Sequence, residues 1–153
     1  MKAVNTKVAI LPTSSADIVF HFQPTKFPQQ ARLYITIDYN HEDTHIHIKS
    51  VTEIVEKYEL VDLCDFLLQH IYKSKENHSH RSEIYVDHTM LYRVRAYEGT
   101  WVTDNDTQEQ YLVFALELFV NVGQPDGKAR VYMGYKGTVD SRHVMKFYER
   151  IKK

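Results

Sequence analysis

Glycine is scarce in this sequence, and none of its five glycines precedes Gly99. Phosphate-binding loops of the P-loop and dinucleotide types need closely spaced glycines, so residues 1–98 contain no such loop. Cys64 is the single cysteine, which excludes an internal disulfide and is typical of a reducing compartment. These absences exclude two large classes of nucleotide-binding enzyme and the disulfide-stabilised secreted domains.

Long hydrophobic runs are absent as well. No apolar segment approaches the roughly 18 residues that a membrane-spanning helix needs. The apolar patch near the N-terminus ends at Pro12 and has no small-residue cleavage site, so it does not have the form of a secretory signal. We therefore expect a cytoplasmic protein that does not enter a membrane.

Common catalytic signatures are missing too. The sequence has no His-Glu-x-x-His motif, no paired cysteines and no nucleophile elbow around a serine. Residues 104–109 begin like a calcium loop, but Glu109 occupies the position that requires glycine, which favours a simple turn. These absences favour a protein that is not an enzyme.

The composition is that of a folded globular protein, with 153 residues of which 43% are hydrophobic and 25% charged. A chain of this length forms one ordinary domain and buries roughly 68–70% of its unfolded surface without a disulfide or metal. We predict a single domain over residues 1–153.

Charge is balanced overall but segregated along the chain. The net charge of −1 creates no general attraction for nucleic acid or an anionic membrane. Residues 98–127 carry six acidic side chains and no lysine or arginine, whereas residues 128–153 carry eight basic and two acidic side chains. Either the two segments neutralise each other as neighbouring elements, or they form a dipolar surface that docks a charged partner or a second copy of the chain.

Alternating apolar residues predict that the fold consists mainly of β-strands. Residues 111–122 have one apolar face and one mixed face, and Pro125 and Gly127 favour a turn after them. The alternation resumes beyond this turn, which predicts a hairpin. Further alternating runs occupy residues 7–11, 17–23, 31–38, 44–50, 83–87, 90–97 and 99–103.

Two segments have the apolar spacing of amphipathic helices, at about 59–74 and 140–152. Asp140 is a favourable N-cap for the second helix. Residues 50–55 have the form of a capping box but are rich in β-branched side chains, so they either begin the first helix or form a strand. Most connections between strands are too short for parallel crossovers. We therefore predict an α+β fold with about seven to nine strands in a largely antiparallel sheet, open or curled into an open barrel, covered by the two helices.

Histidines provide one candidate site. His41, His45 and His47 lie close together, and the last two share a strand face. Two imidazoles on one face, with a third from the adjacent turn, form a set of ligands that suits zinc. The competing interpretation is that these histidines occupy ordinary solvent-facing positions of a strand.

Alternating basic and aromatic residues provide a second candidate site. If the strands that carry them were neighbours, they would form a patch able to hold phosphates and stack bases. The competing interpretation is a solvated sheet face with arginine stems over aromatic rings. The candidate binding residues are Arg93, Arg95, Lys128, Arg130 and Tyr132, extended by Arg142, Lys146 and Arg150 on the outer stripe of the last helix.

The leading hypothesis is a small interaction protein without catalytic activity, such as an inhibitor or immunity-type module. It would bind a protein partner or associate with itself as a homo-oligomer, since tyrosine and arginine are favoured at interfaces. The first alternative is a nucleotide or single-stranded nucleic-acid binding protein that uses the basic patch. The second is a metal-dependent hydrolase that uses His41, His45 and His47, with zinc as the candidate metal; the other two hypotheses imply no cofactor.

Overall fold

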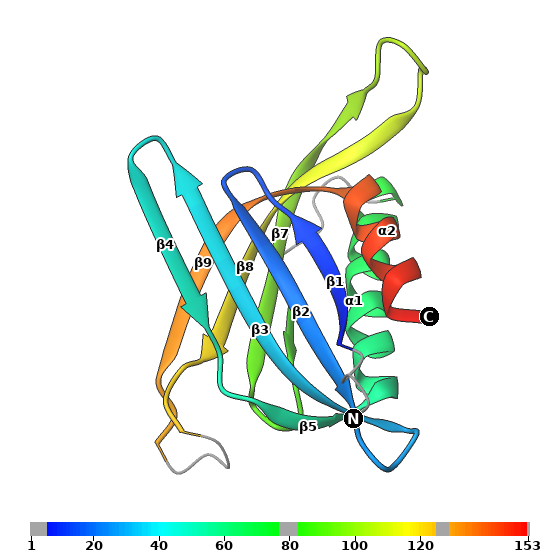
Figure 1. Ribbon diagram of the computed structural model, residues 1–153. Coiled ribbons are helices and arrows are strands. Elements are labelled where there is room, and N and C mark those ends of the chain that lie inside the picture. Colours follow the sequence, from blue (N-terminus) through cyan, green and yellow to red (C-terminus); the bar gives the residue numbers. More distant parts are fainter. Residues whose placement is uncertain (1–5, 77–82, 125–128, 153) are drawn as a thin grey trace.

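The computed structural model describes residues 6–76, 83–124 and 129–152, and its two antiparallel sheets and two helices enclose one hydrophobic core (Figure 1). The first sheet has the order β1 (Lys7–Pro12), β2 (Ala16–Pro24), β3 (Gln30–His41) and β4 (Thr44–Lys49), and β5 (Glu53–Glu56) also pairs with β3. The second sheet has the order β6 (Glu83–Val86), β7 (Tyr92–Thr103), β8 (Gln110–Asn121) and β9 (Tyr132–Asp140). The helices are α1 (Lys57–Glu76) and α2 (Ser141–Lys152).

The predicted α+β fold with antiparallel strands is confirmed. The strands are divided between two sheets, and no closed barrel forms among the described residues. The two predicted hairpins are present as β3–β4 and β8–β9. The second of these includes residues 125–128, which lie outside the described part of the chain.

The period-two pattern sets the register of the strands. Ile37 lies opposite Ile18 on one side and Ile48 on the other, so the apolar residues of three strands share the inner face. On the outer face, Asp38 lies opposite His47. A shift of one residue would exchange these two faces, which is why the apolar pattern specifies the register.

Two strands predicted separately at 90–97 and 99–103 are in fact one strand, and that prediction is wrong. The register of β7 against β8 shifts between Ala96 and Gly99, which marks a bulge. Gly99 allows β8 to approach closely, because a Cβ atom here would lie 2.4 Å from the carbonyl oxygen of Val113. The bulge interrupts the alternation that a strand shows in sequence.

The segment before α1 forms a strand rather than the start of the helix. Val55 in β5 is buried and lies opposite Ala31 in β3. β-Branched side chains fit such a half-buried sheet position well. This pairing decides between the two alternatives that the sequence leaves open for residues 50–55.

Both predicted helices are present, with similar bounds. The apolar stripe of α1, which includes Leu63, Cys64 and Leu67, is buried. Asp140 caps α2, since its Oδ1 atom accepts a hydrogen bond from the amide of Arg142 at 2.8 Å. No described helix combines the length and the apolar character needed to cross a membrane.

The helices lie side by side and cover one open side between the two sheets (Figure 1). Phe20 of β2 stands where all these layers meet. Its ring packs edge-on against Phe147 of α2, with centroids 5.2 Å apart, and against Tyr92 of β7, at 5.6 Å. A single aromatic cluster therefore joins the first sheet, the second sheet and α2.

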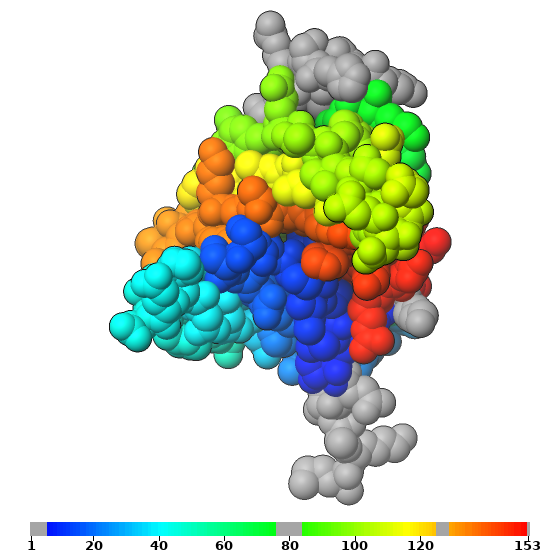
Figure 2. Space-filling model, turned by 90° about the horizontal axis from the view of Figure 1, so that it is seen from above, coloured from blue at the N-terminus to red at the C-terminus, as the bar shows by residue number. Residues whose placement is uncertain are grey.

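The two sheets also touch through the β1–β2 turn, which lies against β9 (Figure 2). The amide of Ser14 donates to the carbonyl of Thr138 at 3.0 Å, and the Ser14 hydroxyl accepts from the Thr138 amide at 3.1 Å. Tyr135 reaches the same turn, where its hydroxyl is hydrogen-bonded to Thr13 and Ser15. These contacts hold the outer strand of the second sheet in place.

Candidate functional site: a basic–aromatic sheet face

The outer surface of the second sheet gathers basic and aromatic side chains in rows across three strands. Arg95 of β7 lies opposite Glu117 of β8, which lies opposite Lys136 of β9. In the next row, Arg93 lies opposite Phe119. We call this surface the basic–aromatic face, and its members are Arg93, Arg95, Tyr97, Glu117, Phe119, Tyr132 and Lys136.

The strands that carry the predicted basic residues are not direct neighbours, because β8 lies between β7 and β9. The direct cross-strand neighbours of Arg93 and Arg95 are therefore Phe119 and Glu117 of β8, and the residues of β9 lie one strand further away. Neither Phe119 nor Lys136 was among the predicted site residues. Their alternating positions placed them on outer strand faces, but only the pairing of strands shows which outer residues lie together.

Cations of this face lie over its own aromatic rings. The Arg93 guanidinium carbon is 4.9 Å from the ring centroid of Phe119. The ammonium nitrogen of Lys136 is 4.1 Å from the centroid of Tyr97, and the Arg95 guanidinium carbon is 6.0 Å from the same ring. These contacts restrict the long side chains before any partner binds, which lowers the entropy lost on binding.

Tyr132 connects the basic–aromatic face to the β6–β7 turn. Its hydroxyl donates a hydrogen bond to the carbonyl oxygen of Met90 at 2.5 Å. Arg130 is exposed just before β9 begins, and the predicted residue Lys128 lies outside the described part of the chain. Of the first predicted group, the structure therefore brings Arg93, Arg95 and Tyr132 to one face.

The charge of this face is predominantly positive. Arg93, Arg95 and Lys136 are all exposed, whereas the only carboxylate among its members, Glu117, accepts a hydrogen bond of 3.5 Å from the hydroxyl of Tyr97. The neighbouring strand β6 adds Ile84 opposite Arg95 and Val86 opposite Arg93, with exposed fractions of 47% and 43%. The surface thus combines several fixed cations with an exposed apolar border.

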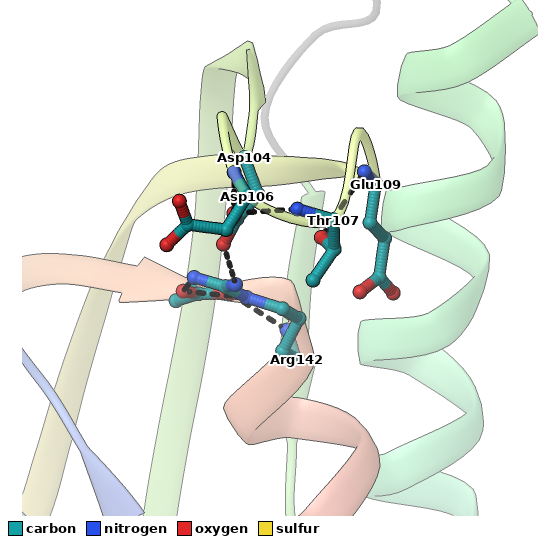
Figure 3. A network of polar contacts seen from close by, with 6 residues as sticks. Asp104, Asp106, Thr107, Glu109 and Arg142 are labelled. Atoms are coloured by element: carbon teal, nitrogen blue, oxygen red, sulfur yellow. Dashed lines mark hydrogen bonds and ion pairs between the residues drawn. The ribbon is translucent and has the colours of Figure 1, made fainter.

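The predicted basic stripe of α2 has a different role. Arg142 pairs with Asp140 at 2.6 Å and with Asp104 at 3.3 Å (Figure 3), and its guanidinium lies 3.7 Å from the ring centroid of Tyr111. Arg150 donates from Nε to the carbonyl of Val8 at 3.0 Å. Lys146 is exposed on the same helix. Arg142 and Arg150 therefore hold α2 against the β7–β8 hairpin and β1.

The electrostatics of the hairpin support this structural role. Hydrogen bonds from the amides of Asp106 and Thr107, together with Arg142, lower the pKa of Asp104 (Figure 3). Burial acts to raise the pKa of Asp140, but its hydrogen bonds with Arg142 outweigh this effect and lower the pKa. At this point the acidic hairpin and the basic helix neutralise each other, as one of the two interpretations of the segregated charge predicts.

A small cleft opens beside Arg142, between α1, the hairpin and α2. Its volume is about 220 Å³, and its walls include Leu68, Tyr72, Trp101 and Met145. The charge of Arg142 is already matched by two carboxylates. The cleft is therefore less suited to an anionic ligand than its arginine alone would indicate.

The three candidate zinc ligands do not converge. His47 is hydrogen-bonded to Asp38 and His45 to Asn40, while His41 lies 3.9 Å from Glu42. Within residues 6–76, 83–124 and 129–152, no group of three or more histidine, cysteine, aspartate or glutamate side chains is placed to hold a metal ion. The structure thus adds no support to the hydrolase alternative.

Comparison with known proteins adds no functional information for this geometry. No family model matches the chain, and neither the curated proteins nor the solved structures include a significant match.

Proposed function

We propose that this chain is a binding module that recognises an acidic surface of another protein through the basic–aromatic face. The observation that carries the proposal is that Arg93, Arg95 and Lys136, in two adjacent rows of an exposed sheet, are held over aromatic rings. Arginine and aromatic residues are enriched at protein interfaces. An inhibitor-like protein needs no more than such a surface, since it acts by occupying its partner.

The apolar border of the face favours a protein partner. Ile84 and Val86 are exposed beside the two arginines. Apolar side chains of this kind contribute to an interface by excluding water when they meet a complementary apolar surface. A phosphate backbone offers no such surface, whereas an acidic protein patch that contains leucine or valine does.

The alternative of single-stranded nucleic-acid binding draws on the same residues. Its difficulty lies in the aromatic rings, because stacking platforms for bases need accessible ring faces. Arg93 lies over Phe119, and Lys136 lies over Tyr97. A base would have to displace the protein's own cations or stack on the guanidinium planes instead.

Self-association through two copies of this face is disfavoured. An isologous interface would place the predominantly positive face of one copy against the same face of the other. Like charges brought together in this way oppose association. A homo-oligomer would therefore have to use another surface, and we place the function in binding a different molecule.

The test compares two probes, a short fluorescent peptide rich in glutamate and leucine, and oligothymidylate of similar length. The double variant Arg95→Glu, Lys136→Glu should weaken binding of the acidic peptide about tenfold or more, because it places like charges at the interface. The control is Lys146→Glu, which reverses a charge that is also exposed but lies on α2, and it should leave binding unchanged.

Three outcomes separate the hypotheses. Peptide binding that depends on the sheet variant supports the proposal. Tighter binding of oligothymidylate, with a log K against log salt slope of about −0.7 for each phosphate contact, supports the nucleic-acid alternative instead. Equal affinity of the wild-type protein and the sheet variant for both probes rules out this face as the site.

A further inference from the structure

Two carboxyl groups are buried together where α1 meets the β6–β7 turn. Glu59 lies in the first turn of α1, and Asp87 directly follows β6; their exposed fractions are 4% and 1%. The Oε2 atom of Glu59 and the Oδ1 atom of Asp87 have no hydrogen-bond partner among the described residues. Buried oxygens that lack a donor are costly, and two neighbouring carboxylates also repel each other.

His88 is a basic side chain in direct contact with this pair. Its Nδ1 atom contacts the Oε1 atom of Glu59, while the imidazole itself is largely in solvent. The hydrogen bond and charge of Glu59 raise the pKa of His88. Burial raises the pKa of Glu59, the contact with His88 opposes this, and the charge of Asp87 raises it further. The folded protein therefore binds a proton at this place more tightly than the separate groups would.

The remaining groups around the pair also favour the proton-bound form. Asp62 of α1 acts on His88 through its negative charge. The phenols of Tyr85 and Tyr92 stay neutral, because burial raises the pKa of both. The carboxylates of Glu59, Asp87 and Asp62 all act to raise the pKa of His88, and the carboxylate of Asp87 acts to raise that of Glu59.

The buried pair is connected to the basic–aromatic face through the β6–β7 turn. The Oδ2 atom of Asp87 accepts hydrogen bonds from the Thr89 hydroxyl and from the Leu91 amide, the latter at 3.2 Å. Between them, Met90 has a positive φ of 60°, a conformation that a non-glycine residue adopts only when its surroundings require it. The carbonyl of Met90 in turn accepts the hydrogen bond of Tyr132.

We propose that Glu59, Asp87 and His88 form a proton-binding site that holds the β6–β7 turn, and with it Tyr132 and the adjacent arginines, in the arrangement that binds a partner. When the proton is present, either the protonated His88 neutralises Glu59, or the protonated Glu59 carboxyl donates the missing hydrogen bond to Asp87. When it is lost, the Glu59 carboxylate remains buried beside Asp87 without a compensating proton, and the turn that carries Asp87 moves to separate the two groups. This inference rests on the proposed function only in its last step, the effect on binding.

The first experiment needs no partner and follows the imidazole of each histidine by NMR as the pH is raised from about 5 to 9, a range that spans the ordinary histidine pKa. His88 should titrate above the ordinary histidine range, and the amide signals of Met90, Leu91 and Tyr132 should change with the same midpoint. In Glu59→Gln the midpoint of His88 should fall. The matched control is Asp38→Asn, which removes the carboxylate partner of His47 on the other sheet and should leave His88 and the turn unchanged.

The second experiment measures the affinity for the acidic peptide over the same pH range. The wild-type protein should lose affinity for the peptide as the pH rises through the titration midpoint of His88. In His88→Gln, the affinity should no longer change around that pH. His88 is exposed, so this variant should fold even if Glu59→Gln does not.

Each outcome bears on one part of the inference. If the turn signals do not follow His88, or His88 titrates within the ordinary histidine range, the proton-binding site is wrong. If the turn responds as expected but the peptide affinity is independent of pH, the coupling to binding is wrong. If the peptide does not bind at any pH, the proposed function fails while the NMR result still stands.

Discussion

The ring of Phe119 lies directly over Gly134, on the neighbouring strand of the basic–aromatic face. A Cβ atom at position 134 would lie 2.5 Å from the Cδ1 atom of this ring. The glycine therefore gives Phe119 the space in which Arg93 can lie over it. An aromatic side chain packed over a glycine also covers the exposed backbone of an outer strand, a recognised way of stabilising sheets.

Gly134→Ala should destabilise the protein and disturb this face. The added methyl group overlaps the ring and forces Phe119 to move off the strand; because both residues lie on the outer face, the loss should be about 0.2–1 kcal/mol, the size of a cross-strand side-chain contact. Urea unfolding measures the change in free energy. Thr138→Ala, on the same strand and face but without such an overlap, serves as the control; an equal loss in both variants would contradict this explanation.

Arg142→Ala should lower the thermal midpoint, because it removes the contacts with Asp140, Asp104 and Tyr111 that hold α2 to the hairpin. Since Arg142 lowers the pKa of both aspartates, their contribution is present above their ordinary pKa of about 3.8 and is lost as the pH falls below it. Wild-type and variant stabilities should therefore converge at low pH and, through screening, at high salt. Lys146→Ala on the same helix should change little; a pH-independent difference for Arg142→Ala would exclude the ion pairs as its cause.

The stability of the wild-type protein should decrease as the pH rises above neutrality. The pKa of His88 is raised by Glu59, so this contribution is fully present below the ordinary histidine pKa of about 6.5 and is lost as the pH passes through the raised value. The raised pKa of Glu59 also makes the folded protein less stable as the pH rises, because the folded state holds this proton more tightly than the unfolded state. In Glu59→Gln the stability should depend less on pH. The neutral amide has no charge that the protonated His88 must compensate, so loss of the His88 proton costs less. Urea unfolding between pH 6 and 9 tests this, and a steeper dependence in the variant would contradict it.

Cys64 should react slowly with thiol reagents while the protein is folded. Its side chain is fully buried in α1, and burial raises the pKa of the thiol to about 12. Because the thiolate is the reactive form, labelling requires opening of the core. Reaction with an aromatic disulfide reagent should speed up across the unfolding transition in urea. Rapid stoichiometric labelling under native conditions would show that this part of the core opens readily.

Local patterns predict much of this fold because each is a short-range property of the chain. The period-two runs of β3 and β8 and the apolar stripe of α1 each require burial of one face, whatever the rest of the molecule does. Asp140 is recognisable as a cap because its hydrogen bond reaches only two residues along the chain. The bulge at Gly99 breaks the alternation, and a single long strand was consequently predicted as two.

The site is less predictable, since it depends on which strands are neighbours. Arg93 and Arg95 stand out in the sequence, but their contact with Phe119 and their proximity to Lys136 follow from the order β7–β8–β9. The same basic residue types serve different purposes in different places. Arg142, expected to bind a partner, is held by Asp104, from which it is separated along the chain by both β8 and β9.

The sequence by itself therefore determined the class of the fold, the positions of most elements, and which face of each element is apolar. Only the tertiary structure decided which charges are neutralised internally and which face solvent. The contact between Glu59 and His88 shows the reason most clearly, because these side chains meet only when α1 packs onto the β6–β7 turn. Burial and the proximity of distant residues set the properties of ionisable groups, and both are consequences of packing that no local pattern contains.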